Sequence, residues 1–75
     1  MEPFMSEVYY YAGETNDYFT QGNKYKVIEV GHHWIKELGR VAWLTNDEYP
    51  YTNDIDYGVS VDLKDFGKGK DFVKY

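Results

Sequence analysis

The sequence predicts a mainly β fold: one small domain over residues 1–75, built as a five-stranded barrel or half-open sheet with at most short helical turns. Several short segments alternate between apolar and polar side chains, which is the period of a strand. Glycine, asparagine and aspartate separate these segments. The chain has no cysteine but nine tyrosines, four phenylalanines and two tryptophans, so aromatic rings rather than disulfides must build its core.

The first expected strand covers residues 7–12, because tyrosine and valine favour a pleated, half-buried surface. Alternation along this strand places Val8 with Tyr10 on one face and Tyr9 with Tyr11 on the other. We assign the Val8 face to the core and expect the Tyr9 face to be exposed. A polar loop separates this strand from the next.

The second expected strand, residues 24–30, follows a tight turn at residues 20–23 and is the most regular in the chain. Its alternation slips at Val27-Ile28, which predicts a β-bulge or burial on both faces. Residues 32–39 are compatible with one helical turn. Because strands flank them, we favour a hairpin that leads into a third strand at residues 40–45.

An acidic, turn-rich loop is expected at residues 46–56, where proline, asparagine and aspartate oppose regular pairing. Residues 57–62 alternate cleanly and predict a fourth strand. A short 3-10 turn at residues 63–66 and a glycine turn at residues 67–69 lead to a closing strand at residues 71–75. The expected core consists of Val8, Tyr10, Tyr25, Val27, Val30, Val41, Trp43, Val59, Val61, Phe66 and Phe72.

Charge is distributed unevenly along the chain. The formal net charge is −5, which opposes binding to duplex nucleic acid because phosphates attract cationic surfaces. Residues 47–62 contain five carboxylates and no lysine or arginine, whereas residues 63–75 contain four lysines and two aspartates. This asymmetry predicts an electronegative patch for a basic protein partner, with a merely solvated loop as the plainer alternative.

The sequence predicts no membrane segment, because no apolar run approaches the roughly 18 residues that span a bilayer. The start of the chain lacks the basic region of a signal peptide, and the absence of cysteine fits a reducing compartment. We therefore expect a cytoplasmic protein. Either Met1 or Met5 is a possible start.

No catalytic or metal-binding pattern is present. His32 and His33 are adjacent on an expected strand, so their rings point to opposite faces. Asp54-x-Asp56 lacks the glycine and the distal glutamate of a calcium loop, and paired carboxylates need a cleft before they can act in hydrolysis. Gly67-Lys-Gly-Lys70 lacks the spacing of a phosphate-binding loop. We expect no enzyme, no cofactor and no metal site.

Two segments carry a resemblance: Phe19-Thr-Gln-Gly-Asn-Lys-Tyr-Lys-Val-Ile28 and Val41-Ala-Trp-Leu-Thr-Asn-Asp-Glu48. Together they resemble small phage-encoded SH3-like barrel proteins. Such proteins often carry Thr-x-Gly-Lys-x-Tyr-x-Val, then a strand ending in Asn-Asp or Asp-Asp, and a phenylalanine near the C-terminus. The matching residues are Thr20, Gly22, Lys24, Tyr25, Val27, Asn46, Asp47 and Phe66 or Phe72, with Asn23 inserted.

The resemblance covers residues 18–75 and implies an SH3-like barrel that acts in the cytoplasm of a host cell. It brings no catalytic residue with it. The acidic insertion at residues 47–56 and the tyrosine-rich first strand depart from the pattern. Because loops on rigid scaffolds often carry function, we expect any special role to lie there.

The charge and the exposed rings predict a non-enzymatic protein that binds and inhibits another protein, and the resemblance implies that it is a phage-type accessory protein whose target is a host protein. A defence component such as a CRISPR effector, or a nucleic-acid-processing protein, would suit an acidic, tyrosine-rich surface, since carboxylates mimic phosphate charge and tyrosines anchor contacts. The expected contact residues are Asp47, Glu48, Tyr49, Tyr51, Asp54, Asp56, Tyr57 and Asp62. The expected exposed rings are Tyr9, Tyr11, Trp34, Tyr49 and Tyr51.

Two alternatives stay open. In the first, the protein sequesters a small signalling nucleotide, with rings stacked on the base and lysines on the phosphates. The lysines expected in that role are Lys24, Lys26, Lys68 and Lys70. In the second, the chain is a structural or assembly subunit.

Overall fold

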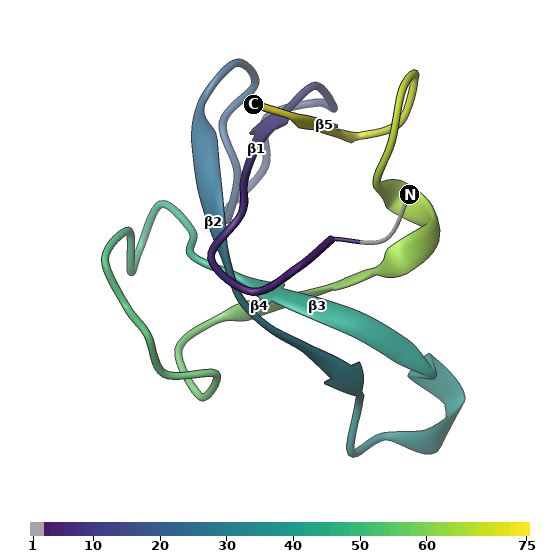
Figure 1. Cartoon of the computed structure of the whole chain (residues 1–75). Coiled ribbons are helices and arrows are strands. Elements are labelled where there is room, and N and C mark those ends of the chain that lie inside the picture. Colours follow the sequence, from purple (N-terminus) through teal and green to yellow (C-terminus); the bar gives the residue numbers. More distant parts are fainter. Residues whose placement is uncertain (1–2) are drawn as a thin grey trace.

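The computed structural model describes residues 3–75 and contains one sheet of five antiparallel strands (Figure 1). The strands are β1 (Val8–Tyr11), β2 (Lys24–His32), β3 (Arg40–Leu44), β4 (Val59–Asp62) and β5 (Phe72–Lys74). Two 3-10 turns, η1 (Lys36–Leu38) and η2 (Leu63–Asp65), are the helical segments of this part of the chain. The expected mainly β fold with only short helical turns is confirmed.

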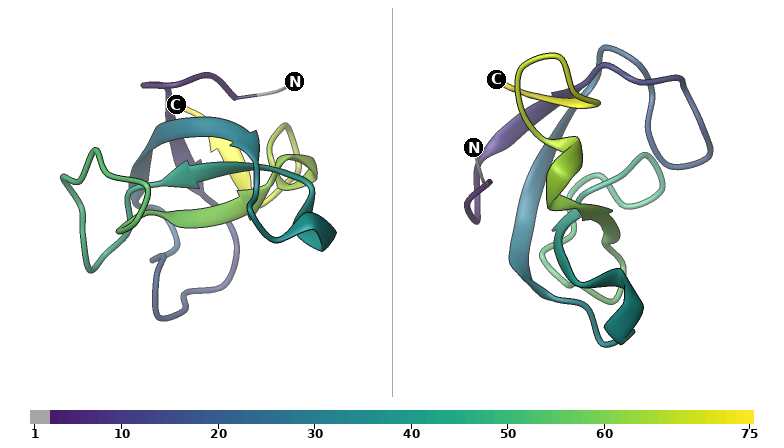
Figure 2. Two further views of the ribbon diagram at one scale, coloured as in Figure 1. Left: turned by 90° about the horizontal axis from the view of Figure 1, so that it is seen from below. Right: turned by 90° about the vertical axis from the view of Figure 1, so that its right-hand side faces the viewer.

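Strand β2 joins the two halves of the sheet. The order across the sheet is β4-β3-β2-β1-β5, and β2 pairs with β1 through its first residues and with β3 through the rest. Its register with β3 shifts between Val27 and Glu29, which confirms the predicted irregularity at Val27-Ile28. Such a bulge bends a strand and increases its twist. The sheet consequently curls, as both views of Figure 2 show.

The sheet does not close, because β4 and β5 are its two edges. The chain leaves β4 through η2 and returns to the far edge, where Phe66 forms an isolated parallel bridge with Phe72. The backbone N–H of Gly67 also donates to the carbonyl oxygen of Phe72 at 2.9 Å. One bridge therefore links the end of η2 to β5 without making a continuous ladder.

The main core is aromatic and corrects the predicted orientation of β1. Tyr9 and Tyr11 are buried, whereas Tyr10 is 38% exposed and Val8 is half-buried. The buried members of this core are Tyr9, Tyr11, Phe19, Tyr25, Val27, Ala42, Leu44, Phe66 and Phe72. Rings from outside β1 decide its orientation: the Tyr9 ring centroid lies 5.1 Å from that of Phe66, and the Tyr11 centroid 5.2 Å from that of Phe72.

Strand β3 is buried on both faces. Ala42 and Leu44 enter the main core, while Val41 and Trp43 join Ile28 in a second cluster on the other face. The predicted burial of Val41 and Trp43 is confirmed, but these residues lie outside the main core. The predictions for Tyr25, Val27, Phe66 and Phe72 are confirmed as well. The remaining predicted core residues, Val30, Val59 and Val61, are partly buried against the main core.

The ambiguous segment before β3 is a hairpin with a 3-10 turn at its tip. Turn η1 lies between β2 and β3, and Gly39 follows it with φ of +65°, a conformation that glycine adopts without strain. The backbone N–H of His33 donates to the carbonyl oxygen of Gly39 at 2.8 Å, which closes the hairpin. Both features considered from the sequence, a hairpin and a single turn, are therefore present.

Candidate protein-contact surface

The acidic loop, residues 46–57, is braced from inside by one buried amide. Asn46 is 1% exposed, and its Oδ1 accepts hydrogen bonds from the backbone N–H groups of Glu48 (3.1 Å) and Tyr49 (3.0 Å). Its Nδ2 donates to the carbonyl oxygen of Tyr57 at 3.0 Å. A single side chain thus ties the beginning of the loop to its end, and its buried polar atoms have partners.

Asp47 connects the acidic loop to the loop before β2. Its Oδ1 accepts from the Tyr25 hydroxyl and its Oδ2 from the Thr20 hydroxyl, each at 2.7 Å. The Tyr25 oxygen in turn accepts from the backbone N–H of Thr20 at 2.7 Å. Burial and the neighbouring Asp47 carboxylate raise the pKa of Tyr25. Because both oxygens of Asp47 have partners inside the chain, this residue holds the loop in place.

The second half of the loop is folded by local hydrogen bonds. Asp54 Oδ1 accepts from the backbone N–H of Asp56 at 2.9 Å, an arrangement in which an aspartate side chain mimics a backbone turn. The carbonyl oxygen of Asp54 accepts from the N–H of Tyr57 at 3.0 Å. Lys26 Nζ on β2 donates to Asn53 Oδ1 at 2.8 Å. The loop is therefore tied to β2 as well as to its own ends.

This braced frame displays rings and carboxylates together. Tyr51 is 91% exposed, Tyr57 51% and Tyr49 41%. The rings of Tyr49 and Tyr57 contact each other, with centroids 4.9 Å apart. The exposed carboxylates on the same loop belong to Asp47, Glu48, Asp54 and Asp56, of which Asp47 is engaged in the bonds described above.

The last predicted contact residue, Asp62, lies elsewhere. It is half-buried at the end of β4, and its Oδ1 accepts from the backbone N–H of Lys64 at 2.9 Å. The side chain therefore caps η2. Seven of the eight predicted residues are exposed on one loop, although Asp47 also braces it, while Asp62 serves local structure elsewhere.

A second exposed surface, missed as a unit by sequence reasoning, is the hairpin tip, residues 33–39. Trp34 is 68% exposed, Ile35 48% and Leu38 46%. The predicted exposure of Trp34 is confirmed. Three large apolar residues so close to a turn were the signal for this surface, since turns are normally polar.

The hairpin tip rests on the second cluster through a stack of rings. The Trp34 and Trp43 centroids lie 5.9 Å apart with an interplanar angle of 15°. The His33 ring contacts both, with centroid distances of 4.1 Å to Trp34 and 6.0 Å to Trp43. His33 Nδ1 also accepts from the backbone N–H of Ile35 at 2.9 Å. Besides the backbone hydrogen bonds of the hairpin, the tip is thus held by stacking and one side-chain hydrogen bond.

The acidic loop and the hairpin tip flank the same cluster. Ile55 of the loop packs against the cluster that contains Trp43, and at Gly58 an added Cβ would lie 3.0 Å from Ile28 Cδ1. Glycine at this position therefore lets the end of the loop lie close to the cluster. In Figure 1 the acidic loop extends to the left of β3 and the hairpin tip lies at the lower right end of β3.

Within residues 3–75, no group of three or more histidine, cysteine or acidic side chains is placed to hold a metal ion. None of the helical segments described is long and apolar enough to cross a membrane. No protein-family model, curated protein or solved structure matches this chain.

Proposed function

We propose that this protein is a non-enzymatic binding module that contacts a protein partner through the acidic loop. One observation carries the proposal: the same loop exposes the ring of Tyr51 and is held in shape by the buried side chain of Asn46. Tyrosine is enriched among the residues that dominate binding energy in protein interfaces. A loop already held in shape loses less conformational freedom on binding, so more of its contact energy contributes to affinity.

The charge of the loop supports a basic partner. Glu48, Asp54 and Asp56 are exposed on the same loop as the exposed tyrosines, and no lysine or arginine occurs from residue 47 to residue 62. Complementary charge mainly accelerates association and selects partners. A nucleic-acid-binding groove of a host defence or nucleic-acid-processing protein has the required positive charge, and the loop would inhibit it by occlusion.

The biological setting follows from the resemblance. We propose a phage-type accessory protein with an SH3-like barrel that acts in the host cytoplasm. The curled, unclosed five-stranded sheet supports this fold, and the position of the acidic loop on a braced frame supports a role in binding.

The test begins with capture of the host protein by the full chain and continues with association kinetics at two salt concentrations. The key variant combines Glu48→Gln, Asp54→Asn and Asp56→Asn, which removes three loop charges but keeps hydrogen-bond acceptors. We expect a slower association rate and a flatter salt dependence, because exposed charges act over about 8 Å at physiological ionic strength. Tyr51→Ala should instead raise the dissociation rate.

The matched control combines Glu14→Gln, Asp17→Asn and Glu37→Gln, which removes the same charge from exposed positions outside the loop. If both triple variants associate at the same rate and with the same salt dependence, net charge explains binding and the loop has no special role. Unchanged dissociation of Tyr51→Ala would also reject the loop as the contact.

A further inference from the structure

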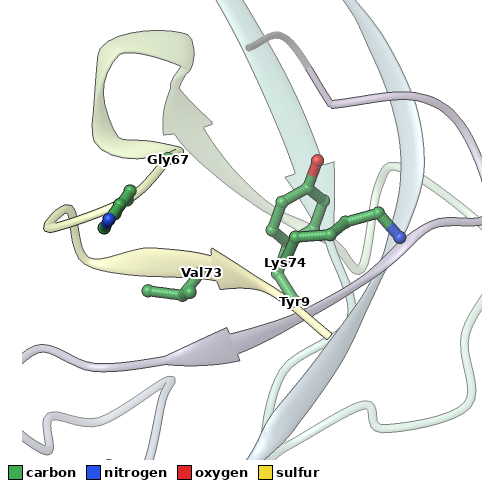
Figure 3. Close-up of a pocket in the computed structure, with 5 residues that line it drawn as sticks. Tyr9, Gly67, Val73 and Lys74 are labelled. Atoms are coloured by element: carbon green, nitrogen blue, oxygen red, sulfur yellow. The ribbon is translucent and has the colours of Figure 1, made fainter.

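A pocket of about 390 Å³ lies beside the edge strand β5, lined by Tyr9, Gly67, Lys68, Val73 and Lys74 (Figure 3). None of these residues belongs to the acidic loop or the hairpin tip. The pocket is bounded by β1, β5 and the turn that follows η2. Its volume falls within the range of pockets that hold small molecules.

The walls of the pocket are formed before any ligand arrives. Gly67 has φ of +135°, which favours glycine, and its backbone N–H and carbonyl group bond Phe72 (2.9 Å) and Lys70 (3.1 Å) respectively. The Tyr9 ring stands edge-on to Phe66, and its hydroxyl donates to Glu7 Oε1 at 2.9 Å. Tyr9 is only 2% exposed, so it forms the floor of the pocket.

The lining combines an apolar floor and wall with two cations. Tyr9 and Val73 supply the apolar surface, and the ammonium groups belong to Lys68 and Lys74. Lys74 Nζ lies 5.7 Å from the Tyr9 ring centroid and 3.6 Å from Glu7 Oε2. Glu7 offsets one of the two positive charges, which leaves a net positive charge at the pocket. The surrounding residues 63–75 contain four lysines and two aspartates.

The lysines considered from sequence for phosphate binding do not gather here, except for Lys68. Lys24 Nζ lies 4.3 Å from the Tyr75 ring centroid, and Lys26 Nζ is bonded to Asn53. Lys70 lies in the turn next to the pocket without lining it. The chemistry of the pocket is therefore defined by Lys68 and Lys74.

We propose that this pocket binds a small organic anion, with a ring-sized apolar body against Tyr9 and Val73 and a phosphate or carboxylate near Lys68. The apolar wall favours a ligand that leaves water, and the net positive charge of the lining favours an anion. The site is separate from the proposed protein contact. The outcome of a ligand-binding experiment at this pocket therefore does not test the role of the acidic loop.

The experiment is a titration of the full chain followed by the backbone amide signals in nuclear magnetic resonance spectra. Phenyl phosphate and benzoate each carry a ring and an anion, and they distinguish a phosphate ligand from a carboxylate ligand. We expect saturable shifts at Gly67, Lys68, Val73 and Lys74. Inorganic phosphate has the anion without the ring, and benzyl alcohol has the ring without the anion. Each should bind at least about threefold more weakly than the two probes.

The variant Lys68→Gln should weaken binding of the better probe by about threefold to tenfold, in line with loss of a charged hydrogen bond at an exposed site. Lys64→Gln is the matched control, because Lys64 is exposed in the same basic segment but does not line the pocket. Lys74→Gln should weaken binding less than Lys68→Gln does, because Glu7 already offsets the Lys74 charge.

Three results would overturn the proposal. One is the lack of saturable shifts at the pocket amides with either probe. Another is equal affinity for inorganic phosphate, which would indicate an adventitious ion only. The third is equal weakening by Lys64→Gln and Lys68→Gln, which would show a diffuse attraction to the basic segment.

Discussion

The acidic loop and the hairpin tip flank the same cluster around Trp43, yet they are held in different ways. The loop depends on directional hydrogen bonds from Asn46 and Asp47, whereas the tip depends mainly on a stack of His33, Trp34 and Trp43. A hydrogen bond is lost when its donor or acceptor atom is removed, whereas the stabilisation from stacked rings decreases in proportion to the apolar area that is no longer buried. The loop should therefore respond to small chemical changes, and the tip only to loss of rings.

The largest expected effect comes from the residue that both regions share. Trp43 is 4% exposed and packs with Ile28, Val41 and Ile55, so Trp43→Ala should lower the free energy of unfolding by about 3–5 kcal/mol. Urea denaturation measures the change. Trp34→Ala, in the same stack but exposed, is the control and should cost far less. Equal losses for the two variants would show that the stack, not the cluster, supplies the stability.

The buried brace of the loop should come next. Asn46→Ala leaves the N–H groups of Glu48 and Tyr49 and the carbonyl oxygen of Tyr57 without their side-chain partner, and should cost about 1–3 kcal/mol. Thermal denaturation measures it. Asn23→Ala, at an exposed asparagine outside the loop, is the control and should change stability by less than about 0.5 kcal/mol. A loss as small as that for Asn46→Ala would contradict the bracing role.

Alkaline pH should weaken the aromatic core. Burial, together with Glu7, raises the pKa of Tyr9 to about 12, and burial raises the pKa of Tyr11. Since the folded state disfavours the phenolate, these groups contribute their full stability below about pH 10, and the contribution is lost as pH rises towards 12. Denaturant midpoints across this range measure the decline. Tyr9→Phe should reduce the decrease of the denaturant midpoint with pH. Tyr51→Phe, at an exposed ring, is the control and should leave that decrease unchanged.

A smaller effect is expected where only one hydroxyl is removed. Tyr25→Phe keeps the buried ring but loses the bonds to Asp47 and Thr20, so it should cost about 1–2 kcal/mol. Tyr10→Phe, on an exposed ring of the sheet, is the matched control. If both changes leave the denaturation midpoint in place, the connection between the two loops does not stabilise the fold.

The smallest effects belong to exposed side chains of the two regions. Tyr51→Ala and Ile35→Ala should each change the free energy of unfolding by less than about 0.5 kcal/mol, because neither side chain is buried. Equilibrium denaturation with both variants checks this. A larger loss for either would mean that the ring or side chain supports the fold, and that exposure alone does not mark a contact residue.

Much of the local structure was predictable from the sequence. Alternation and turn residues predicted the five strands, the irregularity at Val27-Ile28 and the short turn after β4, and all are present. The burial of Tyr25 and Trp43 was also predicted correctly. Most residues of the acidic loop were predicted to be exposed because turn-forming and charged residues dominate that segment.

Tertiary structure alone decided which face of β1 is buried and what Asn46 does. Alternation divides a strand into two faces but does not say which face meets the core, and β1 carries tyrosine on both. Packing against Phe19 of the following loop, and against Phe66 and Phe72 from the distant end of the chain, selected Tyr9 and Tyr11. Asn46 resembles any turn asparagine in sequence. Its bracing role arises only because folding brings Tyr57 within hydrogen-bond distance and excludes water from the amide.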